Sequence, residues 1–241
     1  MKTTIILLTW QRIGSLKNTL HVLANQTYKD FDVYISNSSE KYAARVESYS
    51  KFYSDKLDIT LSHDSNENYA YRRMTIARDL AEAGTEVILF IDDDVTISNK
   101  YVAEMISAYE PKSYTSAYAW RFQENGDNYY RRRKRVFDNK KTIHYCGTAA
   151  SIIDASIFLD KNLFIHPPEV YLMEDLWLSY FAQHVKGWKL KQIVPKNIHI
   201  GGADQNALFK KIMADKANKG TPDKADFLKI LVNDYGWQLK D

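Results

Sequence analysis

The first 110 residues alternate between apolar strand-like runs and helix-like segments, and this alternation constrains the fold more than any other feature. Near-continuous apolar runs with β-branched residues, such as Thr3–Trp10 and Glu86–Asp92, indicate strands that are buried on both faces. The segments between these runs place apolar residues at helical spacing. The pattern predicts an α/β fold in which a mostly parallel central sheet carries helices on both faces.

The second half of the chain has a less regular pattern, with short strands and a late helix. We expect one domain over 1–241, made of a first half (1–110), a smaller mixed second half (111–203) and a helical tail (204–241). The helix after the first strand should have Ser15 as its N-cap, and Gly84 should follow the end of the helix over 68–84. The segments that we expect to form strands are 3–10, 31–36, 56–62, 86–92, 113–122, 142–154, 188–193 and 196–200. Those expected to form helices are 15–26, 41–53, 68–84, 99–109, 173–185 and 204–236.

Composition narrows the possible classes of function. The net charge is only +3, so charge by itself makes no strong case for nucleic-acid binding. Cys146 is the only cysteine, which excludes an internal disulfide and a cysteine-based zinc cluster. The chain has no apolar run near the roughly 18 residues that a membrane helix needs, and Ile5–Trp10 is too short for a signal sequence. We therefore expect a soluble cytoplasmic protein, and the oligomeric state is left open.

Three consecutive acids, Asp92, Asp93 and Asp94, end the most apolar predicted strand. Ligands of open parallel sheets bind beyond the carboxyl ends of the strands. An extended backbone would project Asp92 and Asp94 to one side and Asp93 to the other, so that two carboxylates could share Mn²⁺ or Mg²⁺. The alternative is a solvated acidic turn that complements the dipole of the next helix.

The order of several motifs resembles family 2 glycosyltransferases of the GT-A fold over roughly residues 3–195. Thr9–Arg12 stands where that family has Thr-Tyr-Asn-Arg after its first strand, and Gln26–Tyr28 matches its Gln-Thr-Tyr at a helix end. Asp92–Asp94 resembles its DXD motif, and Glu174-Asp175 resembles its later Glu-Asp helix. The resemblance implies a metal-dependent transferase that moves a sugar from a nucleotide-sugar, with a UDP-sugar as the expected donor.

The same resemblance implies a nucleotide site in the first half. Thr9 and Trp10 would border the base, and Arg12 would lie near the phosphates or the acceptor. Asn37 would accept a hydrogen bond from uracil, although Ser36 stands where the family commonly has Asp. Further nucleotide or diphosphate contacts fall on Arg72 and Arg73, for which a solvated helix face is the alternative.

The metal and sugar contacts implied by the resemblance lie further along the chain. Asp94 would bind the metal, Asp92 the metal or the ribose, and Asp93 would support them. His199 is a further candidate metal ligand, with a structural strand histidine as the alternative. The candidates for sugar or phosphate contacts are Gly147 and Thr148.

An acceptor hydroxyl needs a base to take its proton. Asp175 matches the base of inverting family members and should open a helix beside apolar Leu176 and Trp177. Glu174 is the fallback base or an acceptor-binding partner. The alternative for both is an ordinary acidic helix start.

Other features are open to two interpretations. The basic run 131–135 is either a solvated loop or a cationic flap over the diphosphate or an anionic acceptor. Trp120, Tyr171 and Trp177 either stack on sugars or pack in the core.

We therefore expect an inverting glycosyltransferase that acts on a hydroxyl of a glycan or a related acceptor. A nucleotidyltransferase is a rival class, but the segment after the first strand lacks a glycine-rich basic loop. A non-catalytic nucleotide- or sugar-binding module on the same fold is the second rival.

Overall fold

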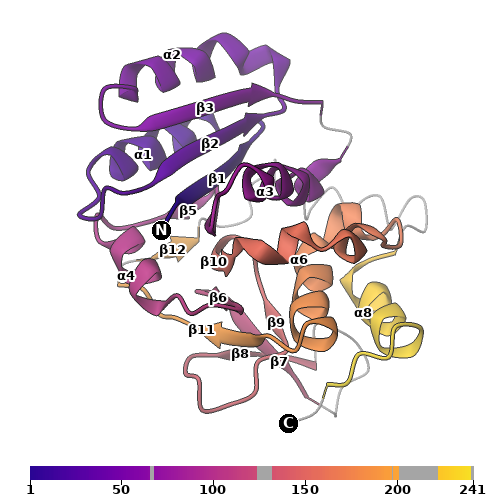
Figure 1. The fold of residues 1–241 in the computed structure, drawn as a ribbon. Helices are drawn as coiled ribbons and strands as arrows, with labels where there is room; N and C mark the ends of the chain where they lie inside the picture. The colour runs from indigo at the N-terminus through magenta and orange to yellow at the C-terminus, as the bar shows by residue number, and fades with distance from the viewer. Residues whose placement is uncertain (66–67, 124–131, 197, 201–221, 240–241) are drawn as a thin grey trace.

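The structure is a computed structural model that describes residues 1–241 except 66–67, 124–131, 197, 201–221 and 240–241. Within this described part, the centre is a seven-stranded sheet with the order β11-β6-β10-β4-β1-β2-β3 (Figure 1). The strands of the first half run parallel to their neighbours: β1 (Thr3–Thr9), β2 (Asp32–Asn37), β3 (Asp58–His63) and β4 (Val87–Asp92). The predicted α/β class is confirmed.

The second half extends this sheet past β4. Its strands are β6 (Ser113–Ser116), β10 (Ala150–Asp154) and β11 (Lys189–Gln192). Strand β10 is antiparallel to both β4 and β6, whereas β11 is parallel to β6. The sheet is therefore mixed but mostly parallel.

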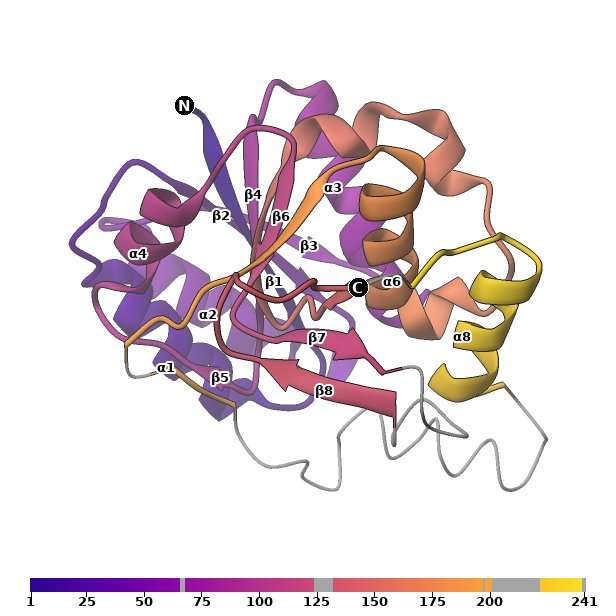
Figure 2. The same cartoon turned by 90° about the horizontal axis from the view of Figure 1, so that it is seen from below.

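Two segments that we predicted as single strands are each divided between two sheets. Residues 113–122 form β6 and then β7 (Ala119–Phe122), because Ser116 Oγ accepts from Tyr118 N at 2.9 Å and closes a tight turn. Residues 142–154 form β9 (Tyr145–Cys146) and then β10. In the described part, β9 and β8 (Arg133–Val136) flank β7 in a small antiparallel sheet (Figure 1), and Figure 2 shows β7 and β8 side by side. A further strand pair joins β5 (Val95–Thr96) to β12 (His199–Ile200).

Helices cover both faces of the large sheet because its strands are apolar on both sides. One face packs against α1 (Ile13–Ala24), α2 (Ala43–Tyr53) and α4 (Tyr101–Ala108). The other packs against α3 (Arg72–Glu82) and α6 (Val170–Tyr180), and α8 (Lys224–Asn233) lies beside α6 (Figures 1 and 2). Within β1, Ile5 and Leu7 face the first layer and Ile6 faces the second, as period-2 alternation requires.

The remaining regular structure is short. It consists of 3₁₀ turns at Glu40–Tyr42, Tyr69–Tyr71, Ala155–Leu159 and Lys161–Phe164 and a π-helical turn at Phe181–Val185. Of the helical tail predicted over 204–236, α8 is observed, and residues 204–221 lie outside the described residues. Among the described residues, no helix has the length and apolar character needed to cross a membrane.

The two predicted helix signals had different outcomes. Gly84 follows α3 with φ = +89°, a left-handed conformation that favours glycine, so this prediction is confirmed. Ser15 is not an N-cap. Helix α1 already begins at Ile13, because Leu16 N donates to Arg12 O at 3.1 Å and Arg12 occupies the cap position.

The strand order also locates the site. Strand β1 pairs with β2 on one side and with β4 on the other, so the chain reverses its direction of travel across the sheet at β1. Open α/β sheets bind ligands outside the carboxyl ends of the strands at such a switch point. Thr9 ends β1 and Asp92 ends β4 at this position.

Candidate active site

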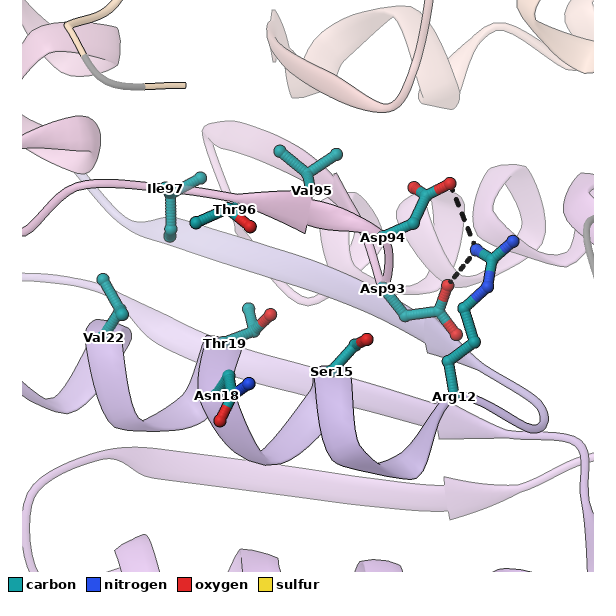
Figure 3. A pocket seen from close by; sticks show the side chains of 10 residues that line it. All are labelled: Arg12, Ser15, Asn18, Thr19, Val22, Asp93, Asp94, Val95, Thr96 and Ile97. Carbon is teal, nitrogen blue, oxygen red and sulfur yellow. Dashed lines mark hydrogen bonds and ion pairs between the residues drawn. The ribbon is translucent and has the colours of Figure 1, made fainter. Parts of the chain in front are cut away.

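Two arginines neutralise the three acids at the end of β4. Asp92 Oδ1 accepts from Arg73 Nη2 at 2.8 Å. Arg12 Nη1 lies 2.9 Å from Asp93 Oδ1 and 3.2 Å from Asp94 Oδ2, and its side chain points from the start of α1 toward both acids (Figure 3). We expected an extended backbone through Asp94, but β4 ends at Asp92 and the chain turns at Asp93 and Asp94, where Arg12 contacts both carboxylates.

Arg73 connects these acids to the second acidic motif. Its guanidinium is buried and lies between Asp92 and Glu174, with Nε 3.3 Å from Glu174 Oε1. Burial would lower the pKa of Arg73, but the Asp92 and Glu174 carboxylates raise it above its usual value. The alternative of a solvated helix face is therefore wrong for Arg73.

Glu174 is buried where α6 packs against α3 and the sheet. Burial raises the pKa of Glu174 to about 7, with Arg73 opposing this effect and Asp175 adding to it. Thr148 Oγ1 donates to Glu174 Oε1 at 3.3 Å, so Thr148 is brought to the site through this carboxylate. A group with a pKa near 7 is suited to taking or giving a proton.

Asp175 does not open its helix, because α6 already begins at Val170. Met173 has φ = −140° and ψ = 36°, which breaks the regular turn just before the two acids. The carboxylate Oδ2 of Asp175 accepts from Tyr145 Oη, at the edge of the small sheet, and from Lys224 Nζ, at the start of α8. Sequence reasoning missed both of these partners.

Arg72 links the ends of β1 and β2. Its Nη2 donates to Thr9 O at 3.2 Å and lies 3.4 Å from Ser36 O, and its side chain is buried rather than solvated. Burial lowers the pKa of Arg72 to about 10, against the raising effect of Asp64. Thr9 is buried at this junction, and its Oγ1 makes no hydrogen bond to any described residue.

Asp64, just after β3, is another residue that sequence reasoning missed. Its Oδ2 accepts from Ser36 Oγ at 2.6 Å and from Ser62 Oγ at 2.7 Å. It therefore places a carboxylate beside Ser36, where the sequence lacks the expected Asp. The mismatch at Ser36 was the signal that could have prompted a search of the neighbouring strand end.

Asn37 is buried at the end of β2, and its side chain is already used locally. Its Oδ1 accepts from Ser39 N at 3.1 Å, and its Nδ2 donates to Ser39 O at 2.9 Å. Trp10 is half-buried just beyond β1. Gly147 N donates to Tyr118 O at 2.7 Å, so this amide is committed to the protein.

His199 lies in β12 and pairs with Thr96 of β5. Thr96 follows Asp94 by two residues in the sequence. In the described part of the chain, no three His, Cys, Asp or Glu side chains gather to hold a metal ion. Mn²⁺ and Mg²⁺ commonly take only one or two protein carboxylates and complete their shell with substrate phosphates. The oxygen donors at the end of β4 fit that chemistry.

The aromatic candidates differ in their surroundings. Trp177 is buried and donates from Nε1 to Leu163 O at 2.7 Å, so it belongs to the core. Tyr171 is 37% exposed at the surface of α6. Trp120 is half-buried, with the guanidinium carbons of Arg133 and Arg135 4.7 and 5.3 Å from its ring centre. The first residue of the basic run, 131, lies outside the described residues.

A pocket of about 200 Å³ opens on the α1 side of the strand-end acids (Figure 3). Its lining consists of Arg12, Ser15, Asn18, Thr19, Val22, Asp93, Asp94, Val95, Thr96 and Ile97. Ligand sites for drug-sized molecules usually span about 300–1,000 Å³, so this pocket has room for only part of a nucleotide-sugar.

The sequence profile of glycosyl transferase family 2 matches residues 4–167. This match covers more than half of the chain, and the chain therefore belongs to glycosyl transferase family 2. The predicted family is confirmed. Among curated proteins, none matches the sequence significantly.

Solved structures show the same fold at low sequence identity. TarS 1-349 from S. aureus in complex with UDP has a TM-score of 0.59 and 17% identity, covering 95% of this chain and 68% of that one. The same protein in complex with UDP-GlcNAc has a TM-score of 0.60 and 17% identity, covering 87% and 61%. The mannosyltransferase PcManGT from Pyrobaculum calidifontis, in complex with GDP-Man and Mn²⁺, has a TM-score of 0.63 and 14% identity, covering 92% and 65%. The chain spans 41% of a longer TarS chain.

Proposed function

We propose that the protein is a metal-dependent inverting glycosyltransferase that moves a sugar from a nucleotide-sugar to a hydroxyl of a glycan or a related acceptor. The observation that carries this proposal is the position of Arg73. It bridges Asp92 at the end of β4 and Glu174 on α6. The carboxylates that would hold a metal ion for the leaving diphosphate therefore lie near the acids that would serve a hydroxyl acceptor.

The donor side is assigned to the carboxyl ends of β1, β2 and β4. Mn²⁺ or Mg²⁺ would be held by Asp94 and Asp92, and when bound it supplies positive charge to the departing diphosphate. Asp93 would support these ligands through Arg12, which contacts both Asp93 and Asp94. UDP and GDP-Man in the similar structures support a nucleotide-sugar as the donor.

We assign the nucleotide site, including the group that reads the uracil ring, to residues of the first half of the chain. Thr9, Trp10 and Arg72 would border the nucleotide. The polar cluster of Ser36 and Asp64 at the ends of β2 and β3 would face the base edge. We favour UDP because a carboxylate can accept the uracil N3–H.

The acceptor side is assigned to Asp175. Its carboxylate removes the proton as the acceptor oxygen attacks the anomeric carbon on the face opposite the diphosphate. The new C–O bond forms, the bond from the anomeric carbon to the diphosphate breaks, and its electron pair leaves with the diphosphate. Glu174 would orient the acceptor or the donor sugar beside this group, and Thr148 would hold Glu174.

Calorimetric titration tests the donor assignment. UDP should bind to the wild-type protein in a manner that depends on Mn²⁺, and Asp94→Ala should abolish that dependence. Asp58→Ala is a matched control, because Asp58 is exposed at the opposite end of β3. Absence of binding to both UDP and GDP, with and without metal, would contradict the proposal.

Replacement of Asp175 by Asn separates an enzyme from a binding module. The variant should bind UDP as the wild-type protein does and should lose sugar transfer by at least about 100-fold, in the range of a lost general base. A binding module would have no transfer activity before or after the change. Pyrophosphate release from a nucleoside triphosphate would instead favour a nucleotidyltransferase.

A further inference from the structure

Lys224 is the first residue of α8, and it reaches from the C-terminal helix to the proposed base. Its Nζ contacts Asp175 Oδ2 and lies 3.0 Å from Tyr145 Oη. Tyr145 Oη also donates to Asp175 Oδ2. These three side chains come from α8, the small sheet and α6, and Lys224 and Asp175 are 49 residues apart. Both lie beyond the family match, which ends at residue 167.

These contacts leave the two oxygens of Asp175 in different situations. Oδ2 accepts from two side chains, whereas Oδ1 accepts from Leu176 N at 2.9 Å. An ionised carboxylate offers about four lone-pair sites, two on each oxygen. Among the described residues, the lone pair that is still available therefore lies on Oδ1.

The cap of α8 holds Lys224 in place. Asp223 caps α8 by accepting from Ala225 N at 2.8 Å and from Asp226 N at 3.1 Å. The side chains of Lys224 and Asp175 are only 20% and 13% exposed. Removing two charges from water is costly even in part, so this partly buried ion pair is weak evidence for a stabilising role. A role in orienting the carboxylate accounts for the arrangement better.

We propose that Lys224 is a positioning residue for Asp175, an inference that rests on the proposed function. With Tyr145 it holds Oδ2, so that Oδ1 faces the acceptor hydroxyl and receives its proton. The acceptor O–H bond breaks and its proton goes to Oδ1, while the acceptor oxygen bonds to the anomeric carbon. The bond from that carbon to the diphosphate breaks, and its electron pair leaves with the diphosphate. Lys224 keeps its own protons and remains beside the carboxylate throughout this step.

Steady-state kinetics test this role with UDP-GlcNAc and GDP-mannose as donors, water as the acceptor and Mn²⁺ present. Lys224→Met should lower kcat by about 10- to 100-fold, as expected for a misplaced reacting group, and leave the donor KM unchanged. Lys224→Arg should restore part of this loss. Lys229→Met is the matched control, because Lys229 is on the same helix with a side chain 62% exposed, and it should behave as wild type.

Thermal unfolding of Lys224→Met, Asp175→Asn and the double variant tests the ion pair without any substrate. The double variant should unfold at least about 2 °C above the temperature that additive shifts predict, because each single change leaves one partner unpaired. Additive shifts, or an unchanged kcat in Lys224→Met, would overturn the inference. Since this cycle needs no nucleotide, it separates failure of the inference from failure of the proposed function, which would appear as absent binding of UDP and GDP.

Discussion

At the scale of single residues, the site combines acids whose charges are compensated by different partners. Arg12 compensates Asp93 and Asp94, whereas Arg73 compensates Asp92 and Glu174. Burial raises the pKa of Asp93 to about 7, although Arg12 opposes this shift. Three adjacent acids repel one another unless positive charge lies nearby, and in this structure that charge comes from arginines of the same chain.

Glu174 should make the stability of the protein depend on pH. Folding raises its pKa from 4.5 to about 7, so the folded protein holds this proton more tightly between those values. The stability that Glu174 contributes is complete below about pH 4.5 and is lost as the pH rises through about 7. The side chain of Glu174→Gln stays uncharged at every pH. The Tm of the wild-type protein minus the Tm of this variant should therefore fall by several degrees from pH 4.5 to pH 8, because only the wild-type protein loses stability at this site.

Thermal unfolding at a series of pH values measures this difference. Glu82→Gln, at the exposed end of α3, is the control and should show no such trend. An equal Tm difference at pH 4.5 and pH 8 for Glu174→Gln would show that Glu174 is not the buried acid described here.

At the scale of elements, a kink in α6 and the start of α8 surround the proposed base. The kink at Met173 directly precedes Glu174 and Asp175, and Lys224 at the start of α8 contacts Asp175. In the proposed reaction, strand ends would supply the donor side, and a helix interior and a helix start would supply the acceptor side. The spacing of apolar residues predicts neither the kink nor the contact at the start of α8, because it indicates only which face of an element is buried.

The capping box of α8 is testable as an element-scale feature. Asp223→Ala removes the acceptor for Ala225 N and Asp226 N, and it should lower the free energy of unfolding by about 0.5–2 kcal/mol in urea titrations. Because Lys224 directly follows the cap, turnover should fall in the same variant. Asp223→Asn keeps a capping side chain and should remain close to wild type. Unchanged stability of Asp223→Ala would mean that the cap does not form in solution.

At the scale of the whole molecule, the chain closes its core with its last described residues. Trp237 is 2% exposed, packs edge-to-face on Phe122 and Tyr180, and donates from Nε1 to Gln183 Oε1 at 3.2 Å. The C-terminal segment is therefore continuous with the core under α6 and the small sheet.

Truncation of this side chain should destabilise the entire fold. Trp237→Ala should lower the free energy of unfolding by about 3–5 kcal/mol, the usual cost of emptying a large buried aromatic site. Phe52→Ala is the control, since Phe52 is 74% exposed, and it should change stability by less than about 0.5 kcal/mol. Chemical denaturation followed by fluorescence and circular dichroism measures both variants. A small loss in Trp237→Ala would show that the C-terminal segment folds apart from the main core.

Much of the fold follows from local pattern in the sequence. The order of strands and helices in the first half, the left-handed Gly84 and the position of the acids at the end of β4 all agree with it. The reason is that strand and helix periodicity, turn chemistry and the polarity of a strand end are properties of neighbouring residues. The family is also determined at this level, because it depends on motifs in a fixed order.

The tertiary structure alone decided which side chains meet. Asp64 lies beside Ser36 because β2 and β3 pair in one register, and Lys224 reaches Asp175 because α8 packs beside α6. Arg73 is buried between two acids, although its helix position is equally compatible with solvent exposure. Contacts between residues distant in the chain depend on register and packing angle, which local pattern does not encode. The sequence by itself therefore determined the framework and the chemical groups available, and the packing of the folded chain determined their pairing.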